Sequence, residues 1–131
     1  MIKVSVDFTE LHETILIELN ESKSPKTTRA ILDSLPLKVK INRWGDELYT
    51  DKTPISAEEE NSQYVVSLSD VAYWPEGNAI CLFMGPTPIS KEPNKIVPYS
   101  PVNVIGKIIT TSTHNILDKV KESTSVIIKA P

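Results

Sequence analysis

The chain has 131 residues, 40% of them hydrophobic, which predicts a single domain spanning residues 1–131 around one core. Its 14 basic and 17 acidic residues are scattered along the chain and give a formal net charge of −3, which argues against binding to nucleic acid or to an anionic membrane. Residues 1–10 lack the basic start and apolar run of a secretory signal, and the single cysteine, Cys81, has no partner for a disulfide. We therefore expect a cytoplasmic protein.

Alternating side chains predict strands along most of the chain. Residues 2–8 and 15–19 alternate between apolar and polar side chains, which indicates a half-buried antiparallel pair of strands. Further strands are expected over residues 37–43, 63–68, 71–74, 79–84, 102–109 and 125–129. Many short strands separated by turn signals are typical of a β-barrel or a β-sandwich.

Two segments have helical patterns. Ser24 and Pro25 supply an N-cap hydroxyl and a proline suited to the first helical position, and a helix over residues 26–35 would then end before Pro36. In residues 115–122 the apolar side chains recur three and four positions apart, which predicts a second helix. Both helices are too short to form a layer, so we expect them to cover the ends of a mainly β fold.

Residues 71–88 are almost uncharged and raise the question of a membrane span. Three prolines and two glycines interrupt this stretch, whereas a spanning helix needs about 20 continuous apolar residues. Pro75 and Gly77 instead fit a type I turn, so the stretch is predicted to be a hairpin. Both faces of residues 79–84 are apolar, which indicates a strand whose outer face is covered by neighbouring loops or by a ligand.

The order of these elements resembles the whole-chain layout of cyclophilins, which are prolyl isomerases. The segments that carry the resemblance are PKTTRAILDSL, INRW and VNVIGKI. In more detail, RWGDELY, DVAYWPEGNAICLFMGPTP and SPVNVIGKI are similar to the compact cyclophilin-like proteins of prokaryotes. The resemblance implies a mainly β fold, namely a closed antiparallel eight-stranded β-barrel with two short capping helices. It also implies peptidyl-prolyl cis-trans isomerase activity.

Isomerisation of an X-Pro bond needs no nucleophile, because its barrier of about 18–20 kcal/mol arises from amide resonance. An arginine that donates a hydrogen bond to the prolyl nitrogen stabilises the twisted amide more than the planar one. INRW is similar to the strand that bears the catalytic arginine of cyclophilins, so Arg43 is the candidate catalytic residue. The alternation of its strand predicts that Arg43 begins on the core side. A structural ion pair of Arg43 with Asp46 or Glu47 is the alternative.

A groove near Arg43 is the predicted ligand site. The candidate ligand-binding residues are Trp44, Glu47, Tyr73, Trp74, Phe83, Pro86 and Thr87. For the aromatic residues, and for Phe83 in particular, packing in the core is the alternative role. The chain departs from cyclophilins at residues 44–49, where the enzymes carry a Phe-x-Met-x-Gln-Gly-Gly segment. Two functions therefore stand: a weak or specialised isomerase that binds proline-containing peptides, and a non-catalytic module that binds an extended peptide or a small anionic ligand.

Other chemistries have little support in the sequence. His12 and His114 are the only histidines, and no cysteine or carboxylate pair joins them at metal-ligand spacing. With four glycines the chain has no glycine-rich phosphate loop, and residues 58–60 are predicted to be a solvated loop. We expect no metal and no cofactor, and the sequence leaves the oligomeric state open.

Overall fold

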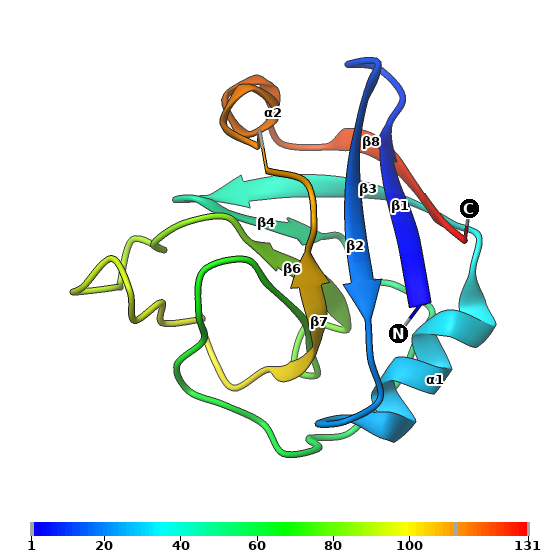
Figure 1. Cartoon of the computed structure of the whole chain (residues 1–131), viewed down its shortest axis with the longest axis vertical. Helices are drawn as coiled ribbons and strands as arrows, with labels where there is room; N and C mark the ends of the chain where they lie inside the picture. Colours follow the sequence, from blue (N-terminus) through cyan, green and yellow to red (C-terminus); the bar gives the residue numbers. More distant parts are fainter. Residues whose placement is uncertain (1, 112, 131) are drawn as a thin grey trace.

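The computed structural model describes residues 2–111 and 113–130, and within them eight antiparallel strands form a closed barrel (Figure 1). The strands follow one another around the barrel in the order β1-β2-β7-β5-β6-β4-β3-β8. The elements are β1 (Ile2–Phe8), β2 (Glu13–Leu19), α1 (Pro25–Ser34), β3 (Leu37–Trp44), β4 (Glu47–Thr50), β5 (Asp70–Trp74), β6 (Ala79–Phe83), β7 (Asn103–Ile108), α2 (His114–Lys119) and β8 (Thr124–Lys129). The predicted fold, a mainly β closed barrel with two short helices, is confirmed.

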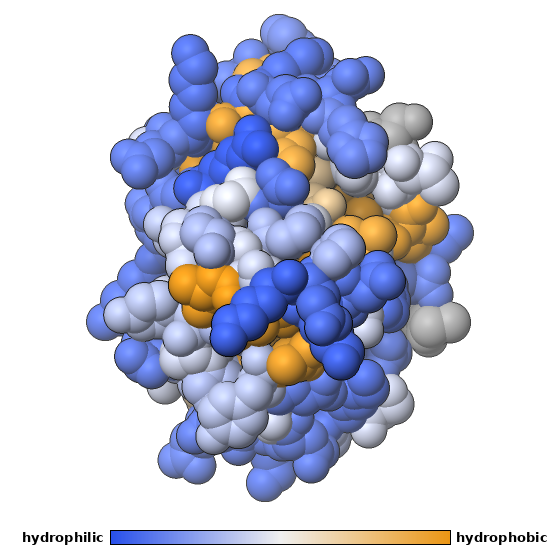
Figure 2. All heavy atoms as spheres, turned by 90° about the vertical axis from the view of Figure 1, so that its left-hand side faces the viewer, coloured by the Kyte–Doolittle hydropathy of each residue, from blue (hydrophilic) through white to orange (hydrophobic). Residues whose placement is uncertain are grey.

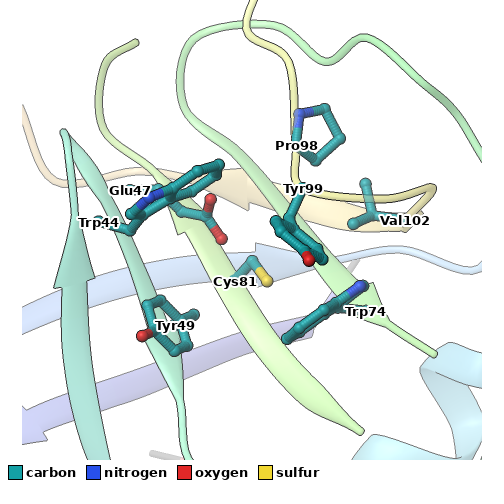
Figure 3. A pocket seen from close by; sticks show the side chains of 8 residues that line it. All are labelled: Trp44, Glu47, Tyr49, Trp74, Cys81, Pro98, Tyr99 and Val102. Carbon is teal, nitrogen blue, oxygen red and sulfur yellow. The ribbon is translucent and has the colours of Figure 1, made fainter. Parts of the chain in front are cut away.

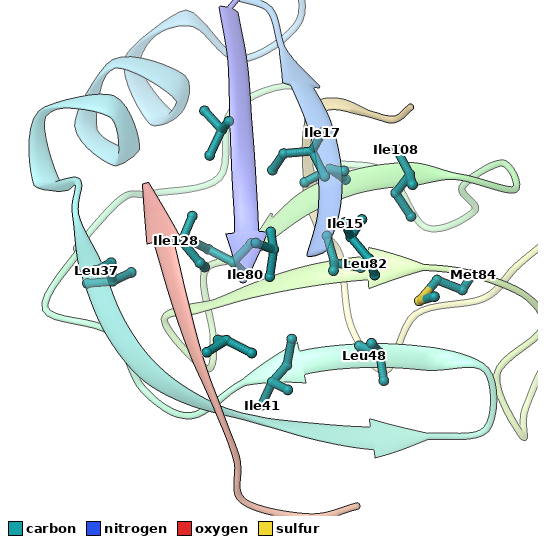
Figure 4. Close-up of a cluster of buried hydrophobic side chains, with 14 of the residues drawn as sticks. Ile15, Ile17, Leu37, Ile41, Leu48, Ile80, Leu82, Met84, Ile108 and Ile128 are labelled. Carbon is teal, nitrogen blue, oxygen red and sulfur yellow. The ribbon is translucent and has the colours of Figure 1, made fainter. Parts of the chain in front are cut away.

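The main core fills the inside of the barrel, as Figure 4 shows. Because successive side chains of a strand point to opposite faces, alternate residues of each strand reach this interior. Figure 4 labels Ile15, Ile17, Leu37, Ile41, Leu48, Ile80, Leu82, Met84, Ile108 and Ile128 among them. The two helices lie on opposite sides of the molecule in Figure 1, and each contributes buried side chains to the same core, Ile31 from α1 and Ile116 and Leu117 from α2.

The strand predicted over residues 63–68 differs from the structure. This segment makes only isolated antiparallel bridges, Gln63 with Val102 and Val66 with Ile96. The eighth strand is instead β4, which pairs with β3 after a tight turn at Gly45. Gly45 has a φ of +62°, and a Cβ there would lie 2.7 Å from the Pro88 Cδ atom, so the turn requires glycine.

Helix α1 is capped by a distant residue. Ser24 stands at the N-cap, but its hydroxyl donates a hydrogen bond to the Glu60 carbonyl and makes no capping bond. The Glu60 carboxylate accepts hydrogen bonds from the backbone N–H groups of Lys26 (3.1 Å) and Thr27 (2.9 Å). These are free donors of the first helical turn. Residues 58–60 form a loop as predicted, with Glu58 and Glu59 exposed, and the partly exposed Glu60 also caps the helix.

A second, smaller cluster covers the outer face of β5 and β6. It consists of Val66, Ala72, Cys81, Phe83, Ile96, Val102 and Val104. The segments around Val66 and Ile96 are loops, and they cover the outer face of β6. Of the two predicted covers, neighbouring loops or a ligand, the structure has the loops. Among the described residues, no helix has the length and apolar character needed to cross a membrane.

The face that carries the loop after β6, on the left of Figure 1, is turned to the viewer in Figure 2. It is mostly hydrophilic, and its apolar side chains appear as small, separate patches.

Candidate functional site

A pocket opens on the outside of the barrel, beside the outer cluster. Its volume is about 180 Å³. Four strands and one loop contribute its walls, which are formed by Trp44, Glu47, Tyr49, Trp74, Cys81, Pro98, Tyr99 and Val102 (Figure 3). Its lining is mainly apolar and aromatic with one carboxyl group, a composition typical of ligand sites.

The pleat of the strands brings the lining residues to one face. In β4, Glu47 and Tyr49 point outward while Leu48 between them points into the core. The register pairs Tyr49 with Cys81 of β6, and it pairs Glu47 with Trp44 of β3. The floor of the pocket is thus built from adjacent strands and is held by the backbone hydrogen bonds of the sheet.

The loop before β7 supplies the opposite wall, with Tyr99 at its centre. The Tyr99 ring meets the Trp44 ring edge-on, with 6.1 Å between centroids, and the Trp74 ring in the same way at 5.9 Å. Two hydrogen bonds fix the loop beside Tyr99, since the Thr87 hydroxyl donates to the Val97 carbonyl and the Val97 N–H donates to the Ser90 hydroxyl. These bonds hold the loop beside the pocket, while Tyr99 itself is 69% exposed.

Trp74 is held from two sides. Its indole N–H donates a hydrogen bond to the Ser100 hydroxyl. The ring also covers Gly77 in the β5–β6 turn, where a Cβ would lie 2.2 Å from the ring. The predicted hairpin is confirmed, and its glycine is needed because the indole occupies the space that a side chain would take.

Glu47 is the only carboxyl group in the pocket, and it is 5% exposed. None of the ion pairs among the described residues includes it. Burial raises the pKa of Glu47 to about 7, although a hydrogen bond with the Cys81 side chain acts in the opposite direction. Near neutral pH the Glu47 carboxyl can therefore either carry or release a proton.

Cys81 lies on the floor of the pocket next to Glu47, and Figure 3 shows its sulfur and the Glu47 carboxyl directed into the same space. Burial raises the pKa of the Cys81 thiol well above its ordinary value, and the charge of Glu47 adds to this effect. A thiol in this state is a weak nucleophile. Cys81 is buried, and the arrangement favours binding over thiol chemistry.

Arg43 points to the other side of the sheet from this pocket. Its Nε donates to the Gly45 carbonyl (2.7 Å), its Nη1 to the Leu117 carbonyl at the end of α2 (3.1 Å), and its Nη2 to the Asp46 carboxylate (2.9 Å). Asp118 is a further partner at 3.7 Å. Arg43 thus ties the β3–β4 turn to α2, and it begins on the core side of its strand as the alternation predicts.

The predicted ligand-binding residues separate into three groups. Trp44, Glu47 and Trp74 meet in the pocket. Tyr73 lies inside the barrel, where its hydroxyl donates to the Ile55 carbonyl, and Phe83 is completely buried in the outer cluster.

The remaining two predicted residues belong to the loop after β6. Pro86 accepts a hydrogen bond from the Asp46 N–H and lines a different hollow, at the end of the barrel. Thr87 is buried and supports the loop that carries Tyr99. Both residues therefore position other parts of the chain and do not line the pocket.

The lining residues that were not predicted are Tyr49, Cys81, Pro98, Tyr99 and Val102. Two signals could have found some of them. The alternation that places Glu47 on the outer face also places Tyr49 there. The apolar outer face of residues 79–84 includes Cys81. Among the described residues, no group of three or more histidine, cysteine or acidic side chains gathers in a way that could hold a metal ion.

Comparisons with known proteins agree with this fold. The solution structure of the hypothetical protein AF2241 from Archaeoglobus fulgidus is 43% identical, with a TM-score of 0.80 over 99% of this chain and 95% of that one. The structure of McbB in complex with tryptophan is 12% identical, with a TM-score of 0.68 over 97% of this chain and 44% of that one, a likeness of fold alone. None of the curated proteins gives a significant match. The family model described as cyclophilin-like matches residues 2–129, and the chain therefore belongs to the cyclophilin-like family.

Proposed function

We propose that this protein is a binding module whose outer-face pocket takes a small ligand or a single side chain of a partner. The observation that carries the proposal is the pocket itself, an aromatic-walled hollow with one buried carboxyl group. Its volume of about 180 Å³ lies below the roughly 300–1,000 Å³ of pockets for drug-sized ligands. The expected ligand group is therefore small, and an extended peptide would place no more than one side chain inside.

Binding without isomerisation fits the position of Arg43. A catalytic arginine has to donate to the prolyl nitrogen of a bound peptide while the amide is twisted. The Arg43 guanidinium already donates to three acceptors, and these lie in the β3–β4 turn and α2 and not in the pocket. An X-Pro peptide held in the pocket against Trp44 and Tyr99 would have no such donor from Arg43.

A negatively charged ligand, one of the alternatives from the sequence, fits this pocket poorly. No lysine or arginine lines it, and the Glu47 carboxyl would repel an anion at close range in a poorly solvated site. The charge of the walls favours a neutral or positively charged ligand.

Exchange spectroscopy on a panel of X-Pro peptides, with catalytic amounts of protein, separates binding from catalysis. We expect no acceleration of cis-trans exchange. The chain has only two tryptophans, Trp44 and Trp74, and both line the pocket, so their indole signals report ligand entry without interference. Peptides or small molecules that enter the pocket should shift these signals.

Two aromatic variants make the test specific. Trp44→Ala should weaken any binding seen at the Trp74 signal, because it removes one wall of the pocket. Tyr64→Ala is the matched control, since Tyr64 is 73% exposed and lies outside the pocket. Acceleration of exchange that is lost in Arg43→Ala while the protein stays folded would contradict the proposal and support an isomerase.

A further inference from the structure

We infer that the group bound in this pocket is an organic ammonium, with its nitrogen paired to the Glu47 carboxylate and its alkyl carbons against Trp44, Trp74 and Tyr99. The inference rests on the proposed binding function and adds the chemical class of the ligand.

The first support is the unpaired acid. Glu47 is 5% exposed, yet none of the ion pairs found within residues 2–111 and 113–130 involves it. Buried carboxylates in proteins are usually paired with a cation, because an isolated buried charge is costly. Figure 3 shows the Glu47 carboxyl directed into the open space of the pocket. A ligand cation that enters this space would supply the missing partner.

The second support is the aromatic wall. Two indoles and a phenol surround the space in front of Glu47, and Tyr99 contacts both indoles edge-on. Aromatic faces attract organic cations, indole most strongly, and sites for alkylated ammonium groups are commonly built from several such rings. The rings also provide apolar contact for the alkyl carbons, which a hydrated inorganic cation would not use.

The protonation state of Glu47 makes the inference testable on the unmodified protein. Burial raises its pKa to about 7, so roughly a tenth of Glu47 is ionised at pH 6 and about nine tenths at pH 8. A cation that requires the ionised form should bind about tenfold more tightly at pH 8 than at pH 6. A neutral ligand of the same shape should show no such gain.

The other titratable groups that face Glu47 do not interfere with this test. They are Cys81 from β6, Tyr49 from the same strand and Tyr99 from the loop. Burial raises the pKa of both Cys81 and Tyr49, so these two groups keep their protons between pH 6 and pH 8. No lysine, arginine or histidine lines the pocket.

Three molecules of equal length separate the possible ligand charges: butylammonium, butanol and butyrate. Each is titrated at pH 6 and pH 8, and the indole N–H signals of Trp44 and Trp74 are followed by NMR. We expect butylammonium to bind most tightly at pH 8, butanol to bind weakly at both pH values, and butyrate not to bind. Butylammonium keeps its proton throughout this range, as a lysine side chain does.

Two carboxyl variants identify the group responsible. Glu47→Gln keeps the size of the side chain and removes its charge. Butylammonium should therefore bind this variant about tenfold more weakly than the natural protein at pH 8, and its affinity should no longer depend on pH. The affinity for butanol should change little. Glu58→Gln removes the same charge from an exposed position outside the pocket and should change neither result. The folded state of each variant is checked by its denaturation curve.

Nα-acetyl-lysine amide distinguishes the two sources of such a cation. Tighter binding of this compound than of butylammonium would indicate a lysine side chain of a partner, and the reverse would indicate a free amine; both support the inference. If butanol bound at pH 8 as tightly as butylammonium, or more tightly, the inference of an ammonium ligand would be overturned, but the proposed binding function would still stand. If none of the compounds and none of the X-Pro peptides shifts either indole signal, the proposed function fails as well.

Discussion

The two faces of β4, β5 and β6 are covered in different ways. Inside the barrel, side chains such as Leu48 and Leu82 meet others from all around the wall and fill the space. Outside, the same strands are covered only in part, by the loops that contain Val66 and Ile96, and the pocket opens where this cover ends. The inner face is therefore fixed by the closed sheet, while the outer face depends on how the loops pack.

Because of this difference, an ionisable carboxyl group that is open to a ligand fits on the outer face and not on the inner one. A carboxyl group inside the barrel would have no partner and no access to solvent, whereas Glu47 on the outer face borders an open pocket. We therefore expect the inner face to supply most of the stability of this barrel, and the proposed binding site places recognition on the outer face. The predictions that follow test that division.

The largest effect is expected from Leu82→Ala on the inner face. Leu82 is 1% exposed and pairs across the sheet with Leu48, so the substitution leaves a cavity that the closed barrel cannot easily fill. We expect a loss of about 2–5 kcal/mol in the free energy of unfolding. Chemical denaturation measures it, and the pocket of the remaining folded protein should still bind ligand.

Cys81→Ala is the matched change on the outer face of the same strand. It removes a small side chain that borders the pocket beside Glu47, so we expect a loss of about 1 kcal/mol. If Cys81→Ala cost as much stability as Leu82→Ala, the outer face would contribute to the core to the same extent, and the division between the faces would be lost.

The second effect comes from the protonation of Glu47. Its pKa is about 7 in the folded protein and about 4.5 in an unfolded chain, so between these values the folded state holds a proton that the unfolded state has released. The contribution of Glu47 protonation to the free energy of unfolding is therefore fully present below about pH 4. It is lost as the pH rises through 7, and the total loss is about 3 kcal/mol.

Glu47→Gln isolates this contribution from those of the other acids. The stability of the natural protein relative to that of Glu47→Gln should decline between about pH 5 and pH 8 and be constant above, because both states are then ionised. Denaturation curves over this range measure the difference. A flat difference would mean that Glu47 already has a partner, and the binding site would then lack its free charge.

Much of the barrel could be predicted from the sequence because the signals are local. The alternation within residues 2–8, the continuous apolar run of residues 79–84 and the turn at Pro75 and Gly77 all depend only on neighbouring side chains. β4 escaped prediction because it has only four residues and begins with Glu47, a charged side chain at a buried position. Its position is set by pairing with β3 and β6, and the local sequence pattern does not indicate this pairing.

The pocket was predictable only in part for the same reason. Trp44 lies in RWGDELY, one of the segments that carry the resemblance, and Trp74 is a large aromatic residue beside the predicted turn, so both are candidates from the sequence. Tyr99 lies in a proline-rich loop, and its position depends on the hydrogen bond of Thr87 with Val97, ten residues apart along the chain. Tyr73 and Trp74 are neighbours in one strand, and the pleat sends the first into the core and the second into the pocket.

A small effect, similar in size to that of Cys81→Ala, is expected from Arg43→Ala, which tests the division between the faces at β3. Arg43 points away from the pocket and Trp44 lines it. The Arg43 side chain is 33% exposed and its ion pair with Asp46 is partly solvated, so we expect a loss of about 1–2 kcal/mol of stability.

Arg43→Lys sharpens this test, because lysine keeps the charge but lacks the planar fork that reaches Gly45, Asp46 and Leu117 at once. If the role is structural, Arg43→Lys should recover only part of the lost stability, and both variants should shift the Trp44 and Trp74 signals with butylammonium as the natural protein does. The measurements are a denaturation curve and an indole titration on the same samples. Arg43→Ala with unchanged stability and a lost ligand response would instead mean that the guanidinium leaves α2 when ligand binds, and Arg43 would then belong to the site, as the resemblance to cyclophilins implies.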